Sequence, residues 1–296
     1  MLAPELLSRI RRLELKAGHL ASEMLLGEYK SAFKGRGWEF DEVREYQVGD
    51  EIRSIDWNVT ARMGQPFVKL FREEREMTLM LLVDVSTSLF FGSSARAKHE
   101  LTAELAAVLA FLAIRQRDKV GLLVFSDHTE LFIPPSKGRA HVWSIIRSIL
   151  THKAQGQKTD LDGALKSFLR VRKRRSLCFL LSDFQAQDYQ RTLRQVAQRH
   201  ELVCMKIEDP AERSIPDAGL VWYQDRETQQ RILIDSSDRW MQKEWPLRRQ
   251  EESKLWQKSM EKAGASVLAV STEENTADAL HRFLRLREHR TQRRRR

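Results

Sequence analysis

Cysteine is scarce in this sequence, with Cys178 and Cys204 the only two among 296 residues. Both lie in apolar runs, LCFLL and LVCMKI, so we expect two buried, reduced thiols rather than a disulfide. No spacing of Cys and His residues resembles a zinc site. These absences argue against a disulfide-stabilised secreted domain and against a fold organised by zinc.

Long hydrophobic runs are also missing. The longest unbroken apolar stretch, from Leu105 to Ile114, has ten residues, whereas a membrane-spanning helix needs roughly 20. The first 16 residues mix charged with apolar side chains and contain no signal-peptide-type hydrophobic region. No G-x-x-x-x-G-K-[ST] motif is present, so we expect no ATP hydrolysis by this chain itself. We therefore expect a soluble, cytoplasmic protein with no membrane span.

A basic domain surface is lacking as well, although the net charge is +10. From His281 onward there are eight Arg residues and one Glu, a net charge of +7, which leaves about +3 for the other 280 residues. The excess charge therefore belongs to the C-terminus. We predict that residues 286–296 form an Arg-rich, disordered tail that is dispensable for folding, and we expect no specific nucleic acid partner.

The order of apolar segments predicts three parts. Residues 1–76 comprise an amphipathic helix over 3–26 and a segment rich in Gly and charge, and residues 77–285 form the main domain. In the main domain, buried strands alternate with helices. Strands are expected at 77–84, 119–126, 129–135, 176–183, 201–207 and 265–270, and helices at 97–116, 138–150, 161–172 and 187–200.

Such alternation predicts an α/β fold with a doubly wound, mostly parallel sheet, helices on both faces and right-handed crossovers. Two prolines end the segment 129–135, which favours an edge strand there. Within residues 209–237, apolar positions alternate on either side of a polar turn, and this pattern predicts a β-hairpin insertion.

Polar side chains follow two of the buried strands. Asp84, Ser86 and Ser88 end the first strand, and Asp183 ends the strand at 176–183. Thr159 precedes the helix at 161–172. Open α/β sheets bind ligands outside the carboxyl ends of their strands, so these five residues are expected to converge on one edge.

The five residues supply only hard oxygen donors, which suit Mg²⁺, or alternatively Mn²⁺ or Ca²⁺, and do not suit zinc or copper. Two carboxylates neutralise a dication, and hydroxyls add no charge, so the ion keeps an open position for a carboxylate from elsewhere. We therefore expect a metal site that captures an acidic side chain of a partner protein.

Three segments, DVSTS, TDLDGAL and LLSDF, resemble the metal-ion-dependent adhesion site of von Willebrand factor A domains. This resemblance implies that Ser86, Ser88 and Thr159 ligate Mg²⁺ directly. It also implies that Asp84 and Asp183 act through water, and that the site binds proteins without catalysis.

The preceding segment is similar to the signature of the bacterial domain of unknown function 58. The matching residues are Gly35-Arg36-Gly37, Phe40, Arg44-Glu45-Tyr46, Gly49-Asp50, Arg53, Asp56-Trp57 and Ala61-Arg62. This resemblance implies association with a MoxR-type AAA+ ATPase or its client. The charged signature residues are expected either to form ion pairs that pack this segment on the main domain or to form a surface for a partner.

Two enzymatic functions are alternatives to a metal-dependent adhesion site. A haloacid dehalogenase-type phosphotransferase with Asp84 as nucleophile needs a D-x-D motif, but Ser86 holds the second position. A PIN-type metal nuclease, with Asp84 and Asp183 as ligands, needs three or four clustered carboxylates. Asp127 and Glu104 are the residues that such a site would recruit, so the nuclease stays open as the alternative. We otherwise expect no catalytic residue and no organic cofactor.

Overall fold

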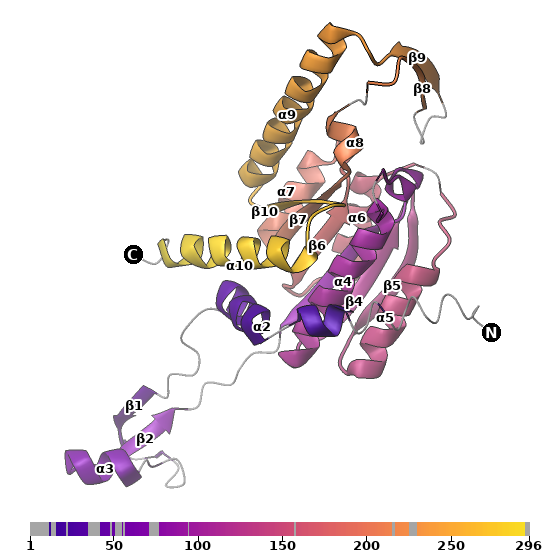
Figure 1. Ribbon diagram of the computed structural model, residues 1–296. Helices are drawn as coiled ribbons and strands as arrows, with labels where there is room; N and C mark the ends of the chain where they lie inside the picture. The colour runs from indigo at the N-terminus through magenta and orange to yellow at the C-terminus, as the bar shows by residue number, and fades with distance from the viewer. Residues whose placement is uncertain are drawn as a thin grey trace.

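The structure is a computed structural model. It describes residues 12, 16–21, 23–34, 42–47, 49–50, 55, 57–70, 77–93, 95–156, 158–214, 217–224 and 230–293. The fold is built around one large sheet, and two small two-stranded sheets lie apart from it (Figure 1).

The large sheet has six strands in the order β10-β7-β6-β3-β4-β5. Every neighbouring pair is parallel except β4 and β5, which are antiparallel. The strands are β3 (Thr78–Asp84), β4 (Lys119–Phe125), β5 (Thr129–Ser136), β6 (Leu177–Ser182), β7 (Glu201–Glu208) and β10 (Ser266–Ser271). The six predicted strands are therefore confirmed, and β5 is the expected edge strand.

Helices cover both faces of this sheet, as Figure 1 shows. Alternate side chains of β3 explain the arrangement, because Leu79 and Leu81 join one buried cluster while Met80 and Leu82 join the other. The first cluster includes side chains of α4 (Lys98–Arg115), α5 (Arg139–Thr151) and α10 (Thr276–Arg293). The second includes side chains of α6 (Leu161–Val171), α7 (Gln190–Arg199) and α9 (Arg239–Lys262). The doubly wound α/β fold is confirmed.

The strand order places a switch point at the centre of the sheet. Among the strands of the large sheet, β3 comes first in the chain. β4 pairs on one side of it and β6 on the other. Connections on the two sides therefore leave the carboxyl ends of β3 and β6 in opposite directions, and this divergence opens a crevice there. Asp84 ends β3, and Asp183 directly follows β6, so both lie at this crevice.

The segment between β7 and β10 departs most from the prediction. The hairpin is confirmed as β8 (Leu220–Gln224) paired antiparallel with β9 (Arg231–Asp235), and a short helix, α8 (Pro210–Arg213), precedes it. The 24-residue helix α9 that follows was not predicted. Among the described residues of α9, only Met260 is buried. The apolar residues of this helix form no dominant stripe, which is why the sequence did not indicate an amphipathic helix here. We call residues 210–262 the arm; Figure 1 shows it in orange.

The N-terminal helix packs on the main domain. Residues 16–20 and α2 (Glu23–Tyr29) are helical, and a π-helical turn, η1 (Lys30–Lys34), follows. Ala17, Leu25 and Tyr29 are buried in the same cluster as β3 and α10. Residues 3–11, 13–15 and 22 of the predicted helix lie outside the described residues.

The signature segment forms a small unit of β1 (Glu42–Glu45), α3 (Trp57–Met63) and β2 (Phe67–Leu70). Arg44 donates two hydrogen bonds to the carboxylate of Asp50, at 2.8 and 2.6 Å. This pair closes the turn after β1 and so joins two signature residues to each other. Gly35, Gly37, Phe40, Arg53 and Asp56 lie outside the described residues.

The predicted disordered tail from residue 286 is wrong over most of its length, because α10 continues to Arg293. Charge alone suggested disorder, but Arg287 has specific partners that a charge count cannot reveal. Its guanidinium pairs with Glu201 of β7 and lies 4.6 Å from the ring centroid of Phe33. Residues 294–296 lie outside the described residues.

We therefore predict that Arg287→Ala lowers the free energy of unfolding by about 1–2 kcal/mol, because it removes a largely buried ion pair and a cation–π contact. The matched control is Arg282→Ala, which removes an exposed pair with Glu274 and should cost about 0.5 kcal/mol or less. Denaturant unfolding of both variants measures the difference. Equal stability of the two variants would show that Arg287 does not anchor the last turns of α10.

Candidate metal centre

The loop after β3 is organised by Asp84, which is 1% exposed. One of its carboxylate oxygens accepts a hydrogen bond from the backbone N–H of Ser86 at 2.9 Å. This bond turns the chain so that the hydroxyls of Ser86 and Ser88 lie 3.0 Å apart, both buried. The D-x-S-x-S spacing thus gathers one carboxylate and two hydroxyls at the end of β3.

The end of β6 is joined directly to this loop. The hydroxyl of Ser182 donates to the second carboxylate oxygen of Asp84 at 2.6 Å. Asp183, 2% exposed, follows, and Phe184 then adopts a left-handed conformation with φ of 58°. This sharp turn lets the backbone N–H of Gln185 donate to Asp183 at 3.3 Å. Asp183 is therefore held beside Asp84 by the geometry of its own loop.

Thr159 reaches the same edge of the sheet on the loop before α6, where it is half-buried. The next residue, Asp160, donates its backbone N–H to the carbonyl of Ser126 at 2.8 Å. Ser126 directly follows Phe125, which pairs with Asp84 in the sheet register. The structure thus joins Asp84, Ser86 and Ser88 by hydrogen bonds and places Asp183 directly after Ser182, which binds Asp84. It also brings the Thr159 loop to the neighbouring strand end.

Glu130 of β5 fixes the loop that carries Thr159, and the sequence analysis did not identify it. Its fully buried carboxylate accepts from the ring of His152 at 2.5 Å and from the hydroxyl of Ser126. The backbone N–H groups of Gln155 and Gly156 also donate to it, at 3.1 and 3.2 Å. Burial opposes its charge, but these bonds lower the pKa of Glu130 to about 2.

The two carboxylates at the switch point lack enough compensating charge. Burial first, and the charge of Asp183 second, raise the pKa of Asp84 to about 7. Two buried carboxylates with two adjacent hydroxyls form a set of hard oxygen donors with excess negative charge, which fits Mg²⁺ or a similar dication. Among the described residues, no group of three or more His, Cys, Asp or Glu side chains is placed to hold a metal ion, so this set relies on hydroxyls.

A buried lysine at this edge of the sheet was not predicted from the sequence. Lys98 begins α4 and is 1% exposed. Its ammonium lies 2.9 Å from the carboxylate of Asp183 and 2.6 Å from that of Glu212 in the arm. Burial lowers the pKa of Lys98, but the two carboxylates outweigh it and raise that pKa overall. The sequence could have indicated the burial of Lys98, because its helical register with Leu101 and Leu105 places it on the buried face of α4.

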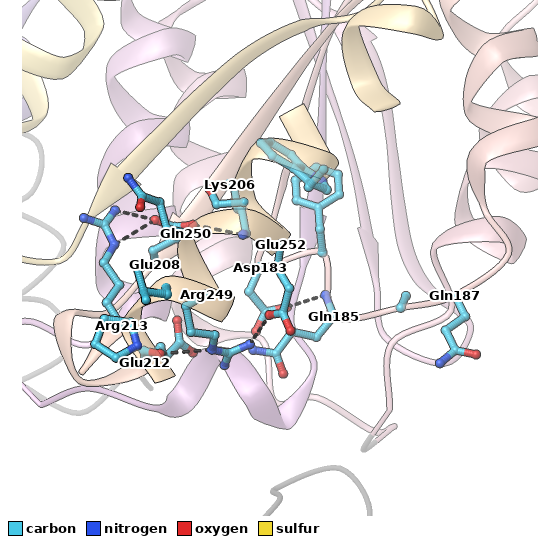
Figure 2. A pocket seen from close by; sticks show the side chains of 16 residues that line it. Asp183, Gln185, Gln187, Lys206, Glu208, Glu212, Arg213, Arg249, Gln250 and Glu252 are labelled. Carbon is cyan, nitrogen blue, oxygen red and sulfur yellow. Dashed lines mark hydrogen bonds and ion pairs between the residues drawn. The ribbon is translucent and has the colours of Figure 1, made fainter. Parts of the chain in front are cut away.

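A groove of about 970 Å³ lies beside Asp183, between the loop after β6 and the arm. Figure 2 shows Asp183, Lys206, Glu212 and Arg249 along it. The rings of Phe184 and Trp256, which also line it, lie with their centroids 4.9 Å apart. Aromatic surface and charged side chains thus border the candidate metal centre on the side of the arm.

The family model described as "Protein of unknown function DUF58" matches residues 42–254. The chain belongs to this family. It is 34% identical over 228 residues to uncharacterised proteins of Mycobacterium tuberculosis and Mycobacterium bovis, covering 76% of this chain and 72% of each relative. The match to the family model begins in the small signature unit and ends within α9.

Solved structures share the fold of this DUF58 protein. An aerotolerance-related membrane protein from Bacteroides fragilis NCTC 9343 superposes with a TM-score of 0.50 at 14% identity, covering 72% of this chain and 99% of that chain. The VWA domain of SpRpn10 gives a TM-score of 0.44 at 8% identity, covering 69% of this chain and 93% of that chain. At 14% identity, the likeness to the first of these structures extends to the fold alone. Within the described residues, no helix is both long and apolar enough to cross a membrane.

We predict that Asp84→Asn stabilises the metal-free protein at pH 8. The folded-state pKa of Asp84, about 7, lies above the ordinary value of 3.8, so its stabilising protonation is complete below pH 4 and lost as the pH rises through 7. Asparagine removes the repulsion from Asp183, so melting in EDTA should occur a few degrees higher than in wild type at pH 8, with a smaller difference at pH 5. The control Asp162→Asn removes a carboxyl whose pKa is lowered, chiefly by Lys166, and should lower stability at pH 8. A less stable Asp84→Asn protein at pH 8 contradicts the charge argument.

A second prediction concerns the loop that carries Thr159. Glu130→Gln removes a buried charge that four donors share, so unfolding should become easier by about 2 kcal/mol at pH 7. Because the pKa of Glu130 is lowered, its contribution is complete above pH 4.5 and disappears as the pH falls through about 2. Hydrogen exchange should also accelerate across residues 152–160. Unchanged exchange there would mean that Glu130 does not hold this loop.

Proposed function

We propose that this protein is a non-enzymatic interaction module that uses a divalent ion to capture an acidic side chain of a partner protein. The supporting observation is the Asp84–Asp183 pair, buried beside Ser86 and Ser88 at the switch point of the sheet. Ser86, Ser88 and Thr159 would hold the ion directly, and the two aspartates would balance its charge. The ion would supply an open position for a carboxylate.

The partner that this proposal names is a MoxR-type AAA+ ATPase or its client, in the cytoplasm, with complex assembly or activation as the process. The exposed apolar side chains support a protein partner. Eight of the thirteen large apolar residues exposed in the described part of the chain lie on the arm, among them Trp222 and Leu233. Exposed apolar surface of this kind is typical of a site that contacts another protein.

The nuclease alternative finds less support in the geometry. Glu104, which such a site would recruit, is bound instead by Lys16 at 2.8 Å and Arg96 at 3.2 Å. Asp127 is exposed and lies 2.5 Å from the ring of His128. Both carboxylates thus have cationic or imidazole partners of their own, whereas metal-dependent hydrolysis needs several carboxylates gathered on the ion.

The first experiment tests the ion alone. Millimolar Mg²⁺ or Mn²⁺ should raise the melting temperature of the wild-type protein, because a ligand at 100 times its dissociation constant stabilises by about 2.7 kcal/mol. Ser86→Ala combined with Ser88→Ala should abolish the rise, and Ser144→Ala, an exposed serine of α5, should retain it. No response of the wild-type protein to either ion would contradict metal binding.

The second experiment tests capture. Immobilised full-length protein should retain a purified MoxR-type ATPase in Mg²⁺, lose it in EDTA, and lose it in the double serine variant. Phosphate-dominated binding would weaken by roughly 10³-fold or more between 50 and 200 mM salt, whereas a single metal–carboxylate bridge should weaken far less. Metal-dependent cleavage of single-stranded RNA that disappears in Asp84→Asn would replace this proposal with the nuclease.

A further inference from the structure

Lys98 already binds a carboxylate that comes from outside the sheet. Glu212 belongs to α8, the first element of the arm, and its carboxylate lies 2.6 Å from the ammonium of Lys98. The same ammonium also lies 2.9 Å from the carboxylate of Asp183. The chain therefore shows how this edge of the sheet receives a carboxylate, with a buried ammonium as the receptor.

Glu212 is also the residue that connects this site to the arm. Its second carboxylate oxygen accepts from the backbone N–H of Asp209 at 3.1 Å. Its own carbonyl accepts from the indole of Trp245 at 3.2 Å and from the guanidinium of Arg249 at 3.1 Å, both on α9. One residue thus links Lys98 to the long helix of the arm, and displacement of its side chain would release that link.

A count of charges shows why, with a dication bound, the site holds one carboxylate beside Lys98 at a time, so that an incoming carboxylate must replace Glu212. Asp84, Asp183 and Glu212 carry −3 when ionised, and Lys98 carries +1, so the four side chains sum to −2. A dication cancels this sum and leaves nothing to attract a further carboxylate. With Glu212 withdrawn, the same site with a dication sums to +1, which favours a carboxylate in its place.

We propose that Lys98 is a carboxylate-binding residue of the capture site, and that Glu212 fills its position until an acidic side chain of a partner replaces it. This inference rests on the proposed capture of an acidic residue, but it assigns the contact to Lys98 and predicts release of the arm. Because the ammonium of Lys98 contacts the carboxylate of Glu212 directly, at 2.6 Å, the pocket that Glu212 leaves accepts a carboxylate even without a divalent ion.

The test uses propionate as a substitute for the glutamate side chain, with the full-length protein in EDTA. Glu212→Ala empties the position beside Lys98, so about 100 mM propionate should raise the melting temperature of this variant by a few degrees at constant ionic strength. Propionamide, which has the same shape without the charge, should have no such effect. The wild-type protein and Glu212→Gln, whose position is filled, should not respond to either compound.

Two further variants make the result specific. Lys98→Met combined with Glu212→Ala should lose the propionate response, and Lys206→Met combined with Glu212→Ala should keep it, because Lys206 lines the same groove but pairs with Glu208. Hydrogen exchange across residues 210–262 should be faster in Glu212→Ala than in the wild-type protein, with and without propionate.

An equal response to propionamide, or no response of Glu212→Ala to propionate, overturns the assignment of Lys98. Unchanged exchange in the arm overturns the role of Glu212 as its link. All of these propionate measurements are made without metal. A propionate response of Glu212→Ala, together with no Mg²⁺ or Mn²⁺ response in the melting experiment, would therefore reject only the metal dependence. The reverse combination would reject only the role of Lys98.

Discussion

The repulsion between two buried carboxylates is the constraint on which the functional edge of this protein depends. Asp84 and Asp183 are each almost fully buried, and this burial, followed by the charge of Asp183, raises the pKa of Asp84 to about 7. Burial of like charges is costly unless cations or hydrogen bonds compensate it. Ser86 and Ser182 supply hydrogen bonds to Asp84, and Lys98 supplies a charge to Asp183. The remaining negative charge is what makes the site suited to a dication.

The rest of the fold positions this pair. The order of the strands brings the ends of β3 and β6 together, and the apolar residues on both faces of β3 keep these ends fixed within the sheet. Glu130 holds the neighbouring loop, and Asp209 accepts from Ser93 and Thr272 so that α8 stays beside the site. The arm then adds a groove and exposed apolar surface, so one edge of the domain combines a charged centre with exposed apolar side chains.

Much of this architecture follows from the sequence, because buried parallel strands are continuous apolar runs and their polar endings are easily recognised. The runs before Asp84 and Asp183 placed both residues correctly at one edge of the sheet. Helix α9 escaped prediction because its apolar residues are spread around the helix, and Arg287 was assigned to a tail because its partners are far away in the sequence. The contacts of Lys98 with Asp183 and Glu212 span 85 and 114 residues, so no local pattern could show them.

We propose that the residues at the switch point hold a dication and thereby receive a carboxylate. Calorimetric titration of Mn²⁺ into the full-length protein tests whether they hold the ion. Binding is expected at a single site, lost when Ser86 and Ser88 are both replaced by alanine and retained in Ser144→Ala. Absence of binding heat, at any temperature where the protein is folded, or binding that persists in the double serine variant, would contradict it.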